Sequence, residues 1–278
     1  MSLFCYDAYN EIRGTFPDAN DRNHRWLVSF GDRTKRFNDA LPTISKARPS
    51  IFSKSPTNII WLLNRRRHYH ELEDYHRNIV QAGKEIPWSE KLSKVVWRGV
   101  STGNRIDYVA QFVKYNDNRL DIAFNKMVQT QNEFMRKYAT KQYVRPHMPI
   151  AEINRYKYLL SFEGNDVASG LKWMLYSNSV VFMAKPTVAS WAMEDLLVPF
   201  VHYIPLADDY SNLLQMVQWA EEHDEACQEI SKRATEYMEH LWISENAKKN
   251  TEFLVKTLVT SYANQFNDAL SKCDPSPR

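Results

Sequence analysis

The chain has 278 residues, 44% of them apolar and 25% charged, which is enough for one large globular domain or two small ones. This composition excludes an intrinsically disordered or fibrous protein. The net charge of +3 is well below the clustered Lys and Arg excess of a dedicated duplex-binding protein, so no nucleic-acid partner is expected.

The first part of the chain predicts two short strands separated by a loop. Residues 25–30 form the first strand, which ends at Gly31-Asp32, and the Pro-, Ser- and Lys-rich stretch 38–57 is expected to be loop. The apolar run 58–64 predicts a buried strand. A polar helix over 68–82 follows, and the break around Pro87 marks a domain boundary.

The rest of the chain alternates between strand and helix patterns. We expect strands at 94–97, 156–162 and 179–184, and a segment 202–206 before the C-terminal helices. Helical patterns cover 107–140, 171–177, 211–222, 225–242 and 246–268. Strands that alternate with helices predict an α/β fold with largely parallel sheets.

The cysteines and the hydropathy give no sign of a metal, disulfide or membrane-bound protein. Cys5, Cys227 and Cys273 are far apart and form no CxxC pair, so neither a structural zinc site nor a disulfide framework is expected. The N-terminal residues do not read as a signal peptide, and no window approaches about 20 apolar residues. We therefore expect a cytoplasmic protein without a membrane span.

A turn rich in glycine and hydroxyl groups follows the strand at 94–97. It supplies backbone N–H groups, hydroxyls and fixed cations, which are what a diphosphate needs. No GxxxxGK[ST] or GxGxxG pattern occurs, so a nucleotide diphosphate is indicated but phosphoryl transfer is not. Ordinary turn glycines are the alternative. The candidate donor-binding residues here are Arg98, Gly99, Ser101, Thr102, Gly103 and Arg105.

A second such turn, 163–170, follows the strand at 156–162 and opens a helix that carries Lys172. The positive end of that helix would favour the same diphosphate. Ser169 could instead act only as an N-cap, and the two interpretations are compatible. The candidates are Gly164, Asn165, Asp166, Ser169 and Lys172.

The stretches PWSEKLSKVVWRGVSTGNR, YKYLLSFEGNDVASGLKWMLYSNSVVFM and WAMEDLLVPFVHYIPLADDYSNLLQMVQWAEEHDEACQEISKRATEYMEHLW resemble glycosyltransferase family 90 over residues 87–242. The resemblance implies a GT-B architecture, in which two Rossmann-like halves face a central cleft, with C-terminal helices. It implies an acceptor-side domain at 1–88, a UDP-sugar domain at 89–245, and a helix at 246–278 that packs back on the N-terminal half.

The resemblance also implies roles for individual residues. Asp32 stands where Rumi-type members of the family have the catalytic base, although Gly31 replaces the preceding Arg. Thr102 and Arg105 match the hydroxyl and the arginine that bind UDP. Lys172 lies near the position of a helix arginine in the family. Two weaker assignments complete the set: Glu194 as a ribose ligand and Asp74 as an alternative base.

The expected function is inverting, metal-independent transfer of xylose, with glucose as the close second choice, from a UDP-sugar to a hydroxyl of a glycan or glycoprotein. A module that binds nucleotide sugars or carbohydrates without turnover is the main alternative. A nucleic-acid site at Arg65–His70 is a weaker one. A metal site built from His68, His70 and His76 lacks ligand spacing, so we expect no cofactor. The acceptor and the oligomeric state cannot be read from the sequence.

Overall fold

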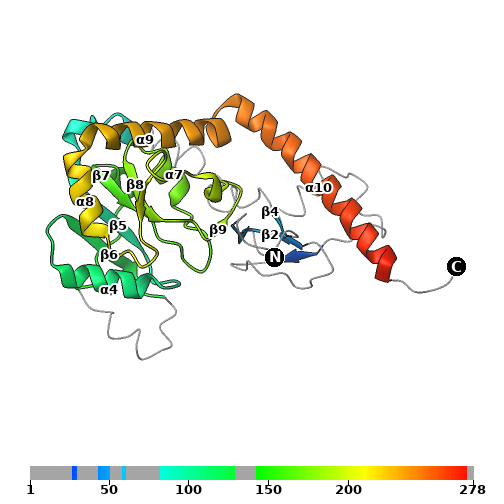
Figure 1. Cartoon of the computed structure of the whole chain (residues 1–278), viewed down its shortest axis with the longest axis horizontal. Helices are drawn as coiled ribbons and strands as arrows, with labels where there is room; N and C mark the ends of the chain where they lie inside the picture. The colour runs from blue at the N-terminus through cyan, green and yellow to red at the C-terminus, as the bar shows by residue number, and fades with distance from the viewer. Residues whose placement is uncertain (1–26, 30–42, 51–57, 61–81, 129–141, 274–278) are drawn as a thin grey trace. The chain divides into compact units, whose positions relative to one another are not determined.

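The computed structural model describes residues 27–29, 43–50, 58–60, 82–128 and 142–273 (Figure 1). The chain divides into two compact units. Unit 1 comprises Met1–His70, Pro186–Asp195 and Leu241–Arg278, and unit 2 comprises Glu71–Lys185 and Leu196–His240.

Unit 2 contains a five-stranded sheet in which every pairing is parallel. Its order is β10-β8-β7-β5-β6. The chain runs from β5 outward to the edge strand β6 and then returns to the other side of β5, so the strand order reverses between β5 and β7. The strands are β5 Leu92–Val100, β6 Leu120–Lys126, β7 Tyr156–Leu160, β8 Val180–Ala184 and β10 Ile204–Leu206.

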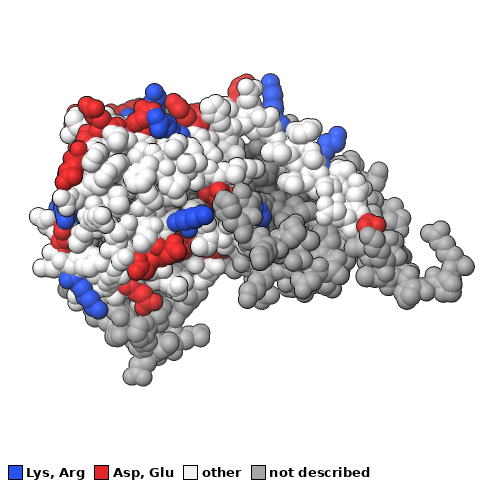
Figure 2. Space-filling model, viewed as in Figure 1, with Lys and Arg blue, Asp and Glu red and all other residues white. Residues whose placement is uncertain are grey.

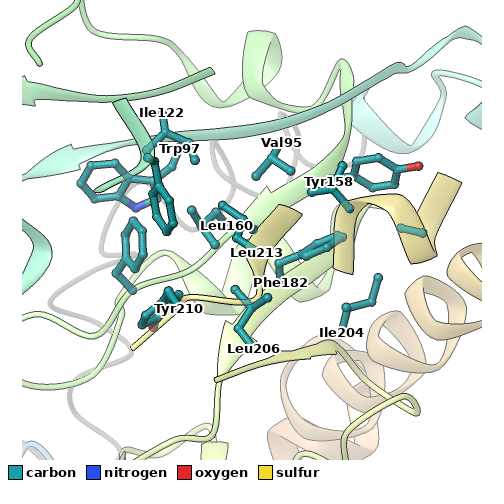
Figure 3. Packing of buried hydrophobic residues seen from close by; sticks show 14 of the residues in the cluster. Val95, Trp97, Ile122, Tyr158, Leu160, Phe182, Ile204, Leu206, Tyr210 and Leu213 are labelled. Atoms are coloured by element: carbon teal, nitrogen blue, oxygen red, sulfur yellow. The ribbon is translucent and has the colours of Figure 1, made fainter. Parts of the chain in front are cut away.

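The core of unit 2 lies on this sheet. Val95, Tyr158, Leu160 and Phe182 from the central strands are at most 1% exposed and pack together in one hydrophobic cluster (Figure 3). Near-continuous apolar runs in β5, β7 and β8 are the sequence pattern that such burial produces. The core is therefore made mainly by aliphatic and aromatic residues on adjacent parallel strands.

The helices of unit 2 follow the strands and pack on them. α4 packs on β6, α8 on β10, and both α7 and α9 on β8. α4 ends where Asn116 adopts a left-handed backbone with φ 48°, a common helix stop. Acidic side chains gather over α8 and α9 (Figure 2). The bounds are η1 Trp88–Glu90, α4 Arg105–Tyr115, α6 Ile150–Ile153, α7 Leu171–Leu175, α8 Leu213–Glu222 and α9 Asp224–Met238.

Unit 1 has short parallel strands and a long C-terminal helix. Strands β1 Val28–Ser29, β2 Thr43–Ser45 and β4 Asn58–Ile60 pair in parallel, and β3 Arg48–Pro49 pairs antiparallel with β9 Val188–Ala189. The buried face of α10 presents Val255, Val259, Tyr262 and Phe266 at helical spacing. The Tyr262 hydroxyl accepts a 2.6 Å bond from the Leu27 N–H. Two further elements are η2 Glu194–Leu196 and the π-helical η3 Glu239–Ile243, which precedes α10 Glu245–Cys273.

Most sequence-predicted elements of unit 2, and the last helix of unit 1, are confirmed. The strands at 94–97, 156–162 and 179–184 are β5, β7 and β8, and the last three predicted helices are α8, α9 and α10. The mixed α/β class and the parallel sheet are confirmed as well. Among the described helices, none has both the length and the apolarity needed to cross a bilayer.

Two predictions about secondary structure were wrong. The single helix expected over 107–140 ends at Tyr115, and β6 Leu120–Lys126 follows it. This strand has apolar residues at alternate positions, Leu120, Ile122 and Phe124, a period of two that its polar neighbours obscured. The loop expected over 38–57 contains the short strands β2 and β3. Such strands of two or three residues are too short to show a periodic pattern.

Candidate functional site

The two glycine-containing turns meet at the carboxyl ends of neighbouring strands. The turn 101–104 follows β5, and the turn 161–170 follows β7, which pairs directly with β5. The strand order reverses between these two strands. In open parallel α/β sheets, ligands bind in the crevice outside the carboxyl ends of the strands at such a reversal. The topology therefore brings together the two turns that the sequence singled out.

The turns touch through two glycines. Gly103 has a φ of +61°, which favours glycine, and a Cβ on it would lie 2.5 Å from the Gly164 carbonyl oxygen. A Cβ on Gly164 would lie 2.7 Å from the Thr102 hydroxyl oxygen. A side chain at Gly103 would push against the Gly164 backbone, whereas one at Gly164 would displace the Thr102 and Arg105 side chains. The glycines thus set how closely the two backbones approach.

Arg105 bridges the same turns with its guanidinium group. Nη2 donates to the Phe162 carbonyl at 2.7 Å, and Nε donates to the Glu163 carbonyl at 3.1 Å. Nη1 donates to the Val100 carbonyl at 3.3 Å and to the Thr102 hydroxyl at 3.0 Å. Burial lowers the pKa of Arg105 to about 10, which Tyr210 and Asp166 partly oppose, so the group stays charged at neutral pH.

Two groups at these turns are left to donate hydrogen bonds to a ligand: the Thr102 hydroxyl and the N-terminus of α4. The Thr102 hydroxyl accepts a bond from Arg105, so its own hydrogen can be donated to a ligand. α4 begins at Arg105, directly after the first turn, and its N-cap Asn104 makes no side-chain cap bond. A helix N-terminus of this kind favours anionic groups. The site can therefore offer a hydroxyl, a helix terminus and a charged arginine to one diphosphate.

An aromatic cluster that the sequence analysis missed supports the second turn. Phe162 lies 5.0 Å from Trp97, 4.9 Å from Tyr210 and 5.7 Å from Tyr108, measured between ring centroids. The buried Tyr210 hydroxyl donates to the Ser161 carbonyl at 3.3 Å, and burial raises the pKa of Tyr210. Tyr210 follows β10, far along the chain, so no local pattern links it to the turn.

Three residues that were predicted to bind the UDP-sugar are instead engaged in contacts within the protein. Arg98 forms a 2.7 Å ion pair with Asp121, and its side chain is only 5% exposed. A Cβ on Gly99 would lie 2.4 Å from the Trp97 ring, so this glycine makes room for an aromatic side chain. Ser101 is fully buried, and its hydroxyl exchanges 2.8 Å hydrogen bonds with the backbone of Val128.

The remaining residues of the second turn differ in exposure. Asn165 is exposed, Ser169 is partly buried, and Asp166 and Lys172 are buried, at 6% and 1% exposed. The N-cap of α7 is Gly170, with no side-chain cap bond, so the alternative that Ser169 caps this helix was wrong. α7 has only 5 residues. The longer α4 has the more developed helix terminus at this edge.

The other predicted residues lie in unit 1 or outside the described ranges. The Glu194 carboxylate accepts 2.6 and 2.8 Å bonds from the Ser190 N–H and hydroxyl and is 2% exposed. Asp32, Asp74 and the run Arg65–His70 lie outside the described residues. Within the described ranges, no group of three or more His, Cys, Asp or Glu side chains could hold a metal ion. The expected metal independence stays a prediction.

We expect Gly103→Ala to weaken the site. The left-handed backbone costs an alanine about 1–2 kcal/mol, and its Cβ would push the Gly164 carbonyl away. Affinity for UDP, the ligand that the family resemblance implies, should fall at least about tenfold in titration calorimetry, with a lower melting temperature. Gly170→Ala is the control, because its φ is negative and the nearest neighbours of its Cβ would be the side chains of Met174 and Trp173, at 3.3 Å, and not backbone. A Gly103→Ala protein that binds UDP as tightly as the wild type would contradict the contact's role.

Sequence comparisons identify the family of the chain. A family model described as glycosyl transferase family 90 matches residues 64–269. The O-glucosyltransferase LpsA of Dichelobacter nodosus is 32% identical over 259 residues, which cover 93% of this chain and 71% of LpsA. Protein O-glucosyltransferase 2 of Danio rerio is 30% identical over 52% of this chain and 28% of its own length. Human protein O-glucosyltransferase 1 is 24% identical, over 82% and 59%. The chain belongs to glycosyltransferase family 90.

Proposed function

We propose that the chain is an inverting, metal-independent glycosyltransferase of GT-B architecture that uses a UDP-sugar. The contact of Gly103 with Gly164, held by Arg105, supports this most directly. It joins the two turns into one narrow anion-binding site at the point where the strand order reverses. Thr102, Arg105 and the start of α4 would hold the diphosphate. We keep three weaker candidates for binding the UDP-sugar: the exposed Asn165 and the buried Lys172 and Glu194.

The proposed reaction is a single displacement at the anomeric carbon. The acceptor oxygen forms a bond to C1 from the face opposite UDP while the bond from C1 to the phosphate oxygen breaks. That electron pair goes to UDP, where a cation and a helix terminus stabilise the negative charge. The acceptor proton goes to a general base, for which we propose Asp32. This carboxylate lies outside the described residues.

We place glucose ahead of xylose as the transferred sugar. Three of the relatives reported above are named O-glucosyltransferases, whereas the sequence analysis put xylose first. The two sugars differ by one hydroxymethyl group, and a difference of this size is worth about 1–3 kcal/mol of discrimination. The chain spans 71% of LpsA and smaller shares of the other two, so the acceptor, a glycan or a glycoprotein hydroxyl, is a proposal.

The direct test is release of UDP from UDP-glucose and UDP-xylose, with a panel of alkyl glycosides and serine peptides as acceptors. We expect turnover with UDP-glucose at the higher kcat/KM, unchanged by EDTA. Loss of turnover with EDTA and its recovery with added metal would overturn the metal-free mechanism. Binding of UDP-sugar without turnover by any acceptor would favour a binding module. A higher kcat/KM with UDP-xylose would instead favour xylose, which the sequence analysis puts first.

A further inference from the structure

Unit 2 has a cavity at the opposite end of the sheet from the donor turns. It has a volume of about 670 Å³ and is bordered by the first residues of β5, β6 and β7 and by the end of α4. Asp121, on its wall, pairs with Val96, six residues before Thr102. At about 3.3 Å per residue, the cavity lies roughly 20 Å along the strand from the donor turns. Its size falls within the range of small-molecule sites, about 300–1,000 Å³.

The anionic groups of the cavity wall are paired with cations. The Asp121 carboxylate binds Arg98 at 2.7 Å, the Tyr156 hydroxyl at 3.1 Å, and also Arg145. These groups hold the pKa of Asp121 below its usual value against the effect of burial. Asp117 binds Arg119 at 2.7 Å. Two cationic and two anionic residues line the wall, so the cavity carries no large charge of either sign.

Three carboxamide side chains that line the cavity have hydrogen-bonding groups available to a ligand. Asn116, Asn118 and Gln142 are exposed and line the cavity, and their side chains make no hydrogen bond to any residue that the structure describes. A carboxamide has both an acceptor oxygen and two N–H donors. A sugar hydroxyl also donates and accepts hydrogen bonds, so a carboxamide matches it better than a carboxylate, which only accepts, or an ammonium group, which only donates.

The lining of the cavity also includes apolar and aromatic residues. Leu92 is 44% exposed, and Val113 and the Tyr156 ring are partly buried beside it. The Tyr156 hydroxyl is held by Asp121, which fixes the ring in place. A fixed ring with one polar end can pack against the C–H face of a pyranose while neighbouring polar groups bind its hydroxyls.

We propose that this cavity binds a neutral oligosaccharide, at a site separate from the donor turns. The combination of paired charges, unused carboxamides and a fixed tyrosine ring selects an uncharged, hydroxyl-rich ligand over an anion. The site does not require the transfer reaction. In a protein that acts on glycans, it would hold a segment of the chain remote from the reacting hydroxyl.

The test is titration of the full-length chain with maltotetraose, cellotetraose and chitotetraose, measured by saturation-transfer NMR and calorimetry. The double variant Asn118→Ala/Gln142→Ala removes two exposed amides, which carry little of the fold's stability. Gln218→Ala on α8 removes another exposed amide, which donates to Glu222 and does not line the cavity. We expect at least one tetrasaccharide to bind, at least about tenfold weaker in the double variant and unchanged in the control.

Saturating UDP should leave this binding intact, and turnover of a monosaccharide acceptor should be the same in the double variant as in the wild type. Failure of the proposed transferase function would therefore leave the binding result readable. Three outcomes would overturn the proposal: none of the three sugars binds, the double variant binds like the wild type, or inorganic phosphate competes with the bound sugar. The last would identify an anion site.

Discussion

Replacing Arg105 by Gln should lower kcat/KM for the UDP-sugar by about 10²–10³-fold, the usual cost of losing one donor that stabilises developing negative charge. It should also destabilise unit 2 by about 2–3 kcal/mol, because the Val100, Phe162 and Glu163 carbonyls each lose a charged partner. Kinetics with UDP-glucose and chemical denaturation would measure the two effects.

Arg105→Lys separates the two roles of this residue. Lysine keeps the positive charge but lacks the planar fork that reaches both turns, so the loss of stability should remain while part of the UDP affinity returns. Arg233→Gln on α9 is the matched control: its pair with Glu229 is almost half exposed on both sides and should contribute about 0.3–0.5 kcal/mol. Wild-type kinetics in Arg105→Gln would remove this residue from the donor site.

Asp32→Asn should lower kcat by about 10²–10⁴-fold, the range of general-base catalysis, with little change in UDP affinity. The amide is close in size to the carboxylate but cannot accept the acceptor proton, so the defect should lie in the chemical step. Single-turnover measurements with radiolabelled UDP-glucose would isolate that step from binding and product release.

Asp74→Asn is the comparison for the base, because Asp74 is the alternative candidate. We expect it to retain wild-type kcat. If the two variants exchanged these results, Asp74 would be the base. If both retained wild-type kcat, neither carboxylate would be, and the inverting mechanism would need a base from elsewhere in the chain.

The predictability of the fold depends on the burial of each strand. β5, β7 and β8 lie inside the sheet, so their apolar runs are continuous and were recognised. β6 lies at the sheet edge, where polar residues such as Asp121 and Asn125 alternate with apolar ones, and it was read as helix. The turn residues Asn116-Asp117-Asn118 before it were the available signal that the helix had ended.

The predictability of the site depends on the range of its contacts. Thr102, Gly103, Arg105 and Gly164 belong to local turns whose composition is informative, and the structure brings them together. The contacts of Arg98 with Asp121 and of Tyr210 with Ser161 join segments 23 and 49 residues apart. Such partners follow from the order of strands in the sheet, which composition and periodicity do not specify.

The bridge formed by Arg105 has a consequence for the thermodynamics of donor binding. Because this side chain ties both turns together through hydrogen bonds to the protein's own carbonyls and to the Thr102 hydroxyl, the diphosphate would meet a preorganised surface. Little conformational entropy would then be lost from these turns on association. Since no slow rearrangement of the turns would precede capture, we expect a rapid association step and a residence time governed by the rate at which UDP leaves.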